Sequence, residues 1–505
     1  MGDLHVPIDR ERGGIAGQIA SELRAAIRRG RLEPGTRLPA SRELAADLQV
    51  SRGVVVEAYE QLVAEGFLIS RVGHGTHVAP AAARDVPEPD PLAEPPATAC
   101  APYYGHRPTS PDLGGFPRER WLAALRHVLA TMPSDALDYG DPGGVPELRE
   151  ELAGYLRRVR AADVRAENLV IVGGVAQGLS LVLHVLAQQG PLRLAVEDPG
   201  SHRQVPLLLR SGAELVPVPV DDEGLDVAAL GPADAALVTP AHQYPTGVVL
   251  SPARRAALME WAAAGRATIL EDDYDAEFRF DRDPVGCLQG LAPDRVVLSG
   301  SVSKALAPGL RLGWVAAPAD LADAIRRARS ELDLGSPVIE QYALARFLRT
   351  GAYDRHLRRM RREYRRRRDS LVRALAEHLP EVRVRGIEAG LHAYLDLPDG
   401  WDEGQVVAHA QALGLAAEPL GPMRFTPGPP AVVVGFARLP AHRTTEAIRA
   451  LKTRTASLRT PAASRLTAPP SAASTTAVSA PPANLPAAKD GGRPRLKGQN
   501  VRTKY

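Results

Sequence analysis

The sequence predicts a multidomain chain, with a small α+β unit over residues 1–78 and a larger α/β domain with a mainly parallel sheet over residues 103–452. Three observations predict this division. Residues 79–102 contain seven prolines and almost no large apolar side chain, so we expect a Pro-rich, extended linker. Short β-rich runs alternate with helical patterns from 103 onward, which is typical of buried parallel strands. Residues 453–505 are rich in Ala, Pro, Ser and Thr, and we expect a disordered basic tail.

Charge is distributed unevenly along the 505 residues, although 62 Lys and Arg nearly balance 59 Asp and Glu for a net charge of +3. Residues 452–505 carry ten basic residues and one acid, whereas residues 1–78 carry ten of each sign. Net charge therefore does not exclude nucleic acid as a partner. Two cysteines are too few for a disulfide framework, and no apolar run approaches the ~18 residues of a membrane span. We expect a cytoplasmic protein that does not bind a membrane.

The first unit predicts three helices followed by a hairpin. A first amphipathic helix places Ile15, Ile19, Leu23 and Ile27 on one face. Ser41 and Ser51 are expected to cap the next two helices, which are joined by only two residues and must therefore cross steeply, as in a helix-turn-helix. After Gly66, two short strand-like runs surround Gly73-His74-Gly75 and predict a hairpin wing.

Arginines at the starts of the second and third helices are candidates for DNA contact. There, guanidinium groups and unpaired backbone N–H groups can meet phosphates, and the third helix can enter a major groove. From the helix pattern alone, a small bundle used for oligomerisation is the alternative. The segment PGTRLPASRELAADLQVSR and the hairpin resemble the winged helix-turn-helix of the GntR regulators, which implies double-stranded DNA half-sites as the partner. The predicted DNA-binding residues are Arg42, Arg52, Gly53, Arg71, His74 and Gly75.

In the larger domain, residues 299–314 (SGSVSKALAPGLRLGW) predict a site for pyridoxal phosphate. Lys304 follows a predicted strand and would form the Schiff base with the cofactor aldehyde. Ser301 and Ser303 would donate to the phosphate, and Arg311 would bind it with two parallel hydrogen bonds. Taken alone, Lys304 is more simply interpreted as a solvated lysine.

Other segments support this interpretation. Asp272, at the end of an apolar strand, could keep the ring nitrogen protonated, and Tyr274 could hydrogen-bond the ring oxygen. A glycine-rich turn precedes an apolar helix, whose first N–H groups would bind the phosphate. The residues at this turn are Gly174, Val175 and Ala176. No metal ligands are predicted.

These motifs, in this order along residues 103–450, resemble the fold type I aminotransferases. The resemblance implies that Tyr139 reaches the phosphate of a neighbouring subunit, and hence a homodimer. Together, the two resemblances identify the chain as similar to the MocR subfamily of GntR regulators, in which a winged helix is fused to an aminotransferase-like domain. With the long linker, we expect the winged-helix domains to be exchanged between subunits.

The sequence departs from the aminotransferase pattern near the expected substrate. Tyr244 precedes Pro245, where aminotransferases carry asparagine, and Val433 stands where their carboxylate-binding arginine is expected. Arg424 is a possible substitute or a surface residue. Ser201 replaces a frequent aromatic, which leaves His202 as a possible neighbour of the ring.

These departures favour a DNA-binding transcription regulator whose aminotransferase-like domain senses pyridoxal phosphate, or an amine or amino acid bound to it. An active aminotransferase with an appended DNA-binding module is the alternative. A further basic feature is the stretch 358–368, with eight arginines. Its apolar positions keep helical spacing, so it predicts either the solvated face of an amphipathic helix or a second DNA-contacting surface.

Overall fold

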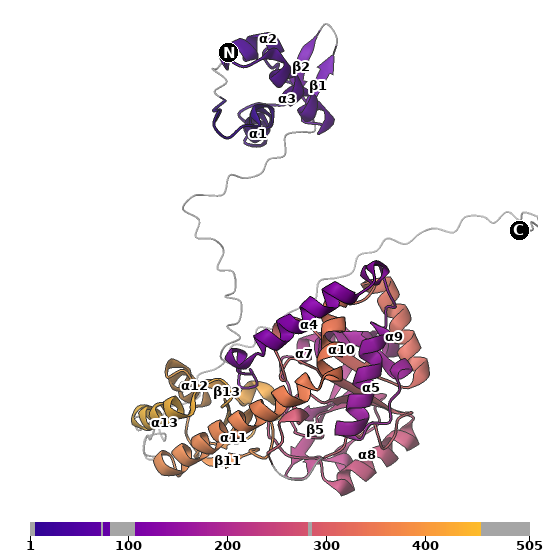
Figure 1. Cartoon of the computed structure of the whole chain (residues 1–505). Coiled ribbons are helices and arrows are strands. Elements are labelled where there is room, and N and C mark those ends of the chain that lie inside the picture. The colour runs from indigo at the N-terminus through magenta and orange to yellow at the C-terminus, as the bar shows by residue number, and fades with distance from the viewer. Residues whose placement is uncertain (1–5, 72–73, 81–106, 281–284, 456–505) are drawn as a thin grey trace, which may run out of the picture. The chain divides into compact units, whose positions relative to one another are not determined.

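The computed structural model describes residues 6–71, 74–80, 107–280 and 285–455. Two compact units divide the chain, Met1–Tyr103 and Tyr104–Tyr505, and Figure 1 shows the elements of each. The predicted linker and the predicted basic tail lie almost entirely outside the described residues. Among the residues that are described, no helix is both long enough and apolar enough to cross a membrane.

The first unit is a winged helix-turn-helix, as predicted. Its elements are α1 (Ile15–Arg28), α2 (Ser41–Asp47), α3 (Arg52–Ala64), β1 (Leu68–Arg71) and β2 (Gly75–Val78). The apolar side of α1 packs against α3, and Ile19, Leu23 and Leu62 are fully buried in the shared core. The two strands pair antiparallel, with Arg71 opposite Gly75.

The expected serine caps are wrong in detail. Ser41 is the first residue of α2, and the preceding Ala40 is the N-cap. The Ala40 N–H donates to the Glu43 carboxylate at 3.1 Å, because a glutamate at the third helical position can reach back to this group. Ser51 does precede α3, but its side chain makes no capping hydrogen bond.

The wing carries a third extended segment, residues 36–38, which directly follows a turn at Pro34-Gly35 and which the sequence did not predict. The Leu38 N–H donates to the Thr76 carbonyl, and the Val78 N–H donates to the Thr36 carbonyl, each at 2.9 Å. Gly75 has φ +86°, and a Cβ there would lie 3.1 Å from Arg37 Nε. Glycine at this position therefore allows both the left-handed conformation and the close approach of Arg37.

An eight-stranded, mainly parallel sheet forms the centre of the second unit. Its order is β3 (Leu169–Val172), β10 (Gly313–Ala316), β9 (Val296–Ser301), β8 (Thr268–Asp272), β7 (Ala235–Val238), β4 (Arg193–Asp198), β5 (Glu214–Asp221) and β6 (Gly224–Leu225). The five strands from β9 to β5 run parallel, whereas β10 is antiparallel to both neighbours and β6 is antiparallel to β5. The predicted α/β class is confirmed: the β-rich runs at 169–173, 192–198, 235–240, 267–273 and 295–300 correspond to β3, β4, β7, β8 and β9.

Helices cover both faces of this sheet, which explains why strands such as β3 and β7 are apolar throughout. On β3, Leu169 and Ile171 enter the core beneath α5 and α10, while Val170 and Val172 enter the core beneath α6 and α9. The helices of this unit are α4 (Arg118–Thr131), α5 (Pro146–Arg160), α6 (Val175–Ala187), α7 (Val205–Arg210), α8 (Pro252–Gly265), α9 (Ala319–Leu332), α10 (Val338–Arg349) and α11 (Ala352–His378).

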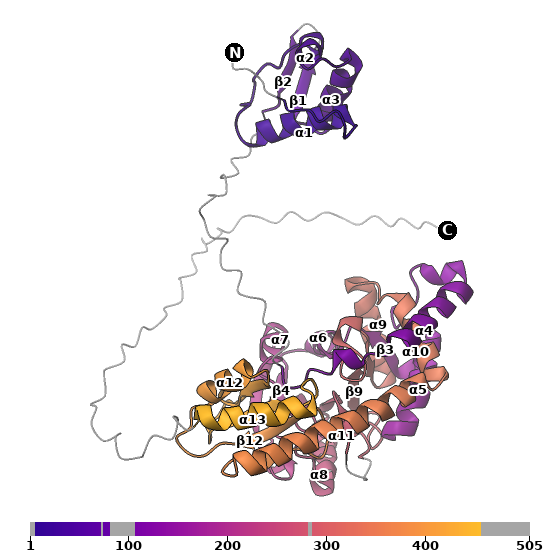
Figure 2. The ribbon, with the colours of Figure 1, turned by 60° about the vertical axis from the view of Figure 1, so that its left-hand side comes forward.

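A second, antiparallel sheet follows in the order β11 (Arg383–Arg385), β12 (His392–Asp396), β14 (Ala431–Gly435) and β13 (Ala416–Pro419). The helices α12 (Glu403–Ala412) and α13 (Ala441–Thr455) belong to this part, and Figure 2 shows α13 lying along α11. Pairing of β13 with β14 places Glu418 opposite Val433. This register brings the second sheet into the site described below.

The arginine-rich stretch lies on α11, and its predicted apolar face is buried. That face consists of Leu357, Met360, Tyr364 and Leu371. Several arginines bind backbone carbonyls of the same unit: Arg361 donates to Glu277 at 2.7 Å, and Arg365 donates to Phe280 at 2.5 Å. These arginines therefore also hold the helix on the domain, in addition to facing solvent.

Candidate functional site

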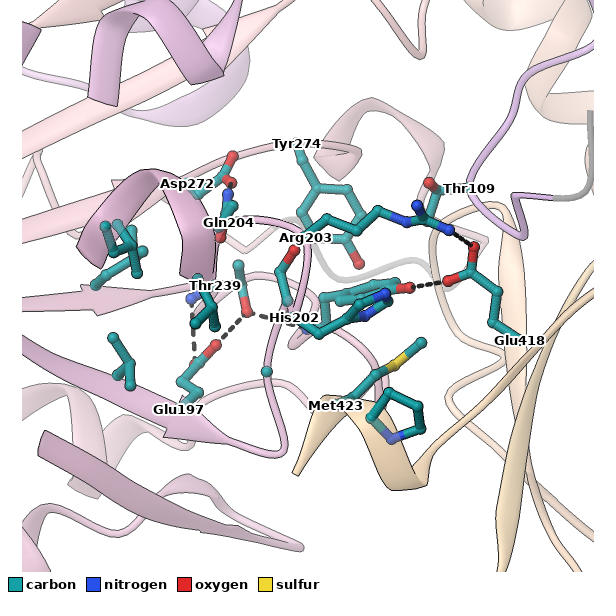
Figure 3. Close-up of a pocket in the computed structure, with 18 of the residues that line it drawn as sticks. Thr109, Glu197, His202, Arg203, Gln204, Thr239, Asp272, Tyr274, Glu418 and Met423 are labelled. Carbon is teal, nitrogen blue, oxygen red and sulfur yellow. Dashed lines mark hydrogen bonds and ion pairs between the residues drawn. The ribbon is translucent and has the colours of Figure 1, made fainter. Parts of the chain in front are cut away.

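A cavity of about 400 Å³ lies at the carboxyl ends of β4, β7 and β8, where open α/β sheets bind their ligands. Its walls include Glu197 from β4, Asp272 from β8 and Lys304 from the turn after β9. The second sheet closes the opposite side with Glu418 and Met423, as Figure 3 shows. The cavity thus combines side chains from segments that are far apart in the sequence.

Lys304 projects into this cavity from the turn that follows β9. Its Nζ donates to Thr109 Oγ1 at 3.2 Å. Burial lowers the pKa of Lys304 to about 8, although Asp275 and other nearby carboxylates act in the opposite direction. A lysine with a lowered pKa has a larger neutral fraction near neutral pH, which is the form that attacks a carbonyl carbon.

Asp272 presents an open hydrogen-bond acceptor in the same cavity. Its Oδ2 accepts from Gln204 Nε2 at 3.0 Å, whereas its Oδ1 is buried and has no partner among the described residues. Burial raises the pKa of this carboxyl to about 7. A buried acceptor of this kind requires a donor for its full stability, and a protonated ring nitrogen would supply one.

Tyr274 also lines the cavity, and a buried cluster holds its hydroxyl. That hydroxyl lies 3.0 Å from His242 Nδ1, which in turn lies 3.0 Å from the Asp275 carboxylate. Burial raises the pKa of Tyr274 well above its ordinary value, so the phenol stays protonated near neutral pH. His392 completes the cluster, whose ligand atoms lie within 4.8 Å of one another. We assign no metal here, because His242 and Asp275 already bond to each other.

The predicted phosphate-binding residues come together beside the start of α6. Gly174 is the N-cap of α6 and has φ +113°, and a Cβ there would lie 3.2 Å from Arg311 Nη2. The N–H groups of Gln177 and Gly178 donate to the Gly174 carbonyl. The N–H groups of Val175 and Ala176 therefore lie at the start of the helix, as predicted for a phosphate site. An arginine over a helix N-terminus is a favourable anion site.

The remaining predicted phosphate donors lie on the same side of the sheet. Ser301 ends β9, and its hydroxyl accepts from the Ser303 N–H at 3.3 Å. Ser303 directly precedes Lys304. The predicted phosphate-binding residues do not line the cavity itself. Ser301 and Ser303 lie just before Lys304 in the chain, and Arg311 follows it by seven residues.

These groups fit pyridoxal phosphate, because each part of the cofactor has a complementary partner. Lys304 would bind the aldehyde carbon, Asp272 Oδ1 would accept from the ring nitrogen, and Arg311 with the α6 N-terminus would bind the phosphate. When bound, the cofactor supplies an electron-withdrawing ring and a carbonyl group that reacts with amines.

The structure places the residues that depart from the aminotransferase pattern as follows. Val433 is fully buried in β14 and contributes no cation to the cavity. Arg424, Ser201 and His202 all line the cavity, so Arg424 is not merely a surface residue. Tyr139 is 82% exposed and does not line the cavity of its own chain.

One pair in the cavity was missed by the sequence analysis. Arg203, in the loop after β4, forms an ion pair with Glu418 of β13. The Tyr244 hydroxyl donates to the other Glu418 oxygen at 3.5 Å. No local motif signals this pair, because the two side chains are more than two hundred residues apart and meet only through the packing of the two sheets.

The predicted DNA-contacting side chains are available on the first unit. Arg42 and Arg52 lie in the first turns of α2 and α3, and both are exposed, as are Gly53, Arg71 and His74. Arg52 Nε donates to Ser41 Oγ at 3.4 Å, which connects the two helix starts. Gly75 is partly buried beneath Arg37.

Comparison with known families agrees with both units. Residues 15–78 match the bacterial regulatory proteins of the gntR family, and residues 110–448 match the aminotransferases of class I and II. Among solved structures, a multiple substrate aminotransferase from Thermococcus profundus has a TM-score of 0.64 at 26% identity, covering 70% of this chain and 91% of that one. An archaeal alanine:glyoxylate aminotransferase has a TM-score of 0.62 at 27% identity, covering 69% and 89%.

Two curated relatives extend over both units. The HTH-type pyridoxine biosynthesis transcriptional regulator PdxR of Corynebacterium glutamicum is 39% identical over 402 residues, 78% of this chain and 86% of its own length. The probable rhizopine catabolism regulatory protein MocR of Rhizobium meliloti is 31% identical over 471 residues, 89% of this chain and 94% of its own length.

Fold, site and relatives define a DNA-binding transcription regulator that carries a domain of the pyridoxal phosphate-dependent aminotransferase family. More specifically, the chain belongs to the MocR subfamily of GntR transcriptional regulators.

Proposed function

We propose that this regulator detects pyridoxal phosphate, or an amine bound to it, in the cavity around Lys304, and that this event changes how it binds operator DNA. The observation that carries the proposal is that Lys304 and the open oxygen of Asp272 line one cavity. The name of the 39% identical relative, a pyridoxine biosynthesis regulator, supports the cofactor as the effector.

Lysine usage supports a specific role for Lys304. It is the only lysine among residues 1–451, in which all other Lys or Arg positions are arginine. Arginine cannot form the covalent bond to an aldehyde that a neutral lysine amine forms. A lysine at this single position is therefore consistent with cofactor attachment.

Cofactor attachment is tested by adding pyridoxal phosphate to the purified full chain, reducing with borohydride, and mapping the modified peptide by mass spectrometry. We expect a visible absorbance band before reduction and modification at Lys304. Lys304→Ala should lose both, whereas Lys452→Ala, an exposed position on α13, should retain both. A colourless wild-type protein with no affinity for the cofactor would refute the proposal.

Regulation rather than turnover is the second part of the proposal. Val433 offers no guanidinium to orient a substrate carboxylate, and correct orientation provides a large part of catalysis. The assay is amino transfer to a keto acid over many turnovers. We expect no sustained turnover, while footprinting of the operator should change on addition of pyridoxal phosphate. Sustained transfer without any change in the footprint would favour the aminotransferase alternative.

We further propose a homodimer with exchanged DNA-binding domains. The boundaries 1–78, 79–102, 103–452 and 453–505 leave a linker of 24 residues, which spans ~70 Å when extended at ~3.1 Å per residue. Tyr139 and the neighbouring Leu137 are large, exposed and apolar, as expected for an interface. Sedimentation of wild type and Tyr139→Ala tests this: a wild-type monomer would contradict the proposal.

A further inference from the structure

An ion pair inside the cavity occupies the guanidinium group of Arg203. The Arg203 guanidinium pairs with the Glu418 carboxylate, and the side chains are 38% and 9% exposed, respectively. The Tyr244 hydroxyl donates to the second Glu418 oxygen. Both oxygens of this carboxylate are therefore held by groups of the cavity wall, as Figure 3 shows.

The location of Glu418 indicates which ligands the cavity can accept. Glu418 lies on β13 directly opposite Val433 of β14, the position at which the aminotransferase resemblance leads one to expect a carboxylate-binding arginine. A guanidinium and a hydroxyl that together hold a carboxylate are also the groups that would recognise the carboxylate of an amino acid. In this chain, that carboxylate comes from the protein itself.

Resting on the function proposed above, we propose that Glu418 fills the carboxylate subsite of this cavity from within, so that the effector is the cofactor alone or a primary amine without a carboxylate. An α-amino acid would have to displace Glu418 from Arg203, which would leave a nearly buried charge without its partner. Otherwise, its carboxylate would lie beside Glu418 and be repelled. Neither penalty applies to an amine that lacks the carboxylate.

Besides Arg107, Arg424 is a competing cation, because it also lines the cavity. Its guanidinium donates to the Pro429 carbonyl at 2.5 Å and to the Tyr394 hydroxyl at 3.3 Å. Both partners are neutral and direct two of its nitrogens toward its own loop and β12. A test of the inference therefore needs a variant in which Arg424 is replaced.

The experiment compares two stable adducts on the full chain freed of cofactor, N-phosphopyridoxyl-L-leucine and N-phosphopyridoxyl-3-methylbutylamine, which differ only by the carboxylate. Calorimetric titration measures both dissociation constants. In wild type, we expect the amine adduct to bind at least about tenfold more tightly. Glu418→Gln should improve the leucine adduct at least about tenfold relative to the amine adduct, and adding Arg203→Gln should abolish this gain. Glu214→Gln, a carboxylate on exposed β5, should keep the wild-type ratio.

Each outcome has a defined consequence. Wild type that binds the leucine adduct as tightly as the amine adduct, or more tightly, overturns the inference. If such a preference for the leucine adduct disappears in Arg424→Gln or in Arg107→Gln, the carboxylate site lies at the arginine that was replaced. If folded Glu418→Gln has the same ratio of the two dissociation constants as wild type, the inference is also overturned. Should that variant not fold, the comparison of the two adducts on wild type remains decisive. Failure of the proposed function is distinct, because then neither adduct nor pyridoxal phosphate would bind.

Discussion

Replacing Asp272 by asparagine should stabilise the cofactor-free chain and weaken its binding of pyridoxal phosphate. Burial raises the pKa of Asp272 from 3.8 to about 7, so the folded chain holds a proton that the unfolded chain releases. The resulting penalty is absent below about pH 4, grows as the pH rises through the interval between the two pKa values, and is constant above about pH 7. Three pKa units correspond to about 4 kcal/mol at pH 8.

The assay is differential scanning calorimetry of the cofactor-free proteins at pH 5 and pH 8. With an unfolding entropy of about 2.1 cal/mol/K per residue over residues 110–448, Asp272→Asn should raise Tm by about 6 °C at pH 8. At pH 5 less than half of this penalty has developed, so the rise should be about 2 °C. If the Tm difference between Asp272→Asn and wild type does not depend on pH, or if the variant has the lower Tm at pH 8, the reasoning is refuted.

The same variant should lose cofactor affinity, since asparagine removes the charge from the acceptor that we propose for the ring nitrogen. Hydrogen bonds to charged groups contribute about 1.5–3 kcal/mol, which predicts roughly 10- to 100-fold weaker binding of pyridoxal phosphate in a direct titration. Asp222→Asn, at an exposed aspartate paired with Arg385, is the matched control and should alter neither stability nor affinity appreciably. Wild-type affinity in Asp272→Asn would separate this carboxylate from cofactor binding.

Three further perturbations test other parts of the molecule. Arg52→Ala should weaken operator binding about tenfold and reduce the salt slope by about one, as measured by mobility shift across a salt series, whereas Arg29→Ala at the end of α1 should do neither. Arg311→Met should weaken pyridoxal phosphate much more than pyridoxal, which lacks the phosphate, and an equal loss for both would contradict the phosphate assignment. If α11 contacts DNA, Arg362→Glu should lower the salt slope in the same mobility-shift series. An unchanged slope would mean that the arginines of α11 only face solvent and hold the helix on the domain.

Local patterns predicted the elements that depend on short-range physics. Apolar runs such as 169–173 and 295–300 became central strands, because strands buried on both faces need continuous apolar side chains. The two closely joined helices of the first unit left little freedom for their crossing, so the helix-turn-helix was predictable as well. The serine caps were not predictable in detail, because α2 begins one residue earlier than expected and its N-cap N–H donates to the Glu43 side chain.

Long-range packing decided what local patterns could not. No strand pattern marks residues 36–38, yet Thr36 and Leu38 form backbone hydrogen bonds with residues of β2. The partners of Tyr274 were likewise hidden, because His242 and Asp275 come from separate turns that meet beneath the second sheet. No periodicity in the sequence encodes such contacts.

By itself, the sequence determined the class of this protein and predicted which lysine, aspartate and arginine would bind its cofactor, because several motifs in one order along the chain support one another. Only the tertiary structure decided the state of those groups. Burial sets the pKa of Lys304 and Asp272, and the register of β13 on β14 brings Glu418 to Arg203. Both effects arise from desolvation and from contacts across the two sheets, which exist only after the chain has folded.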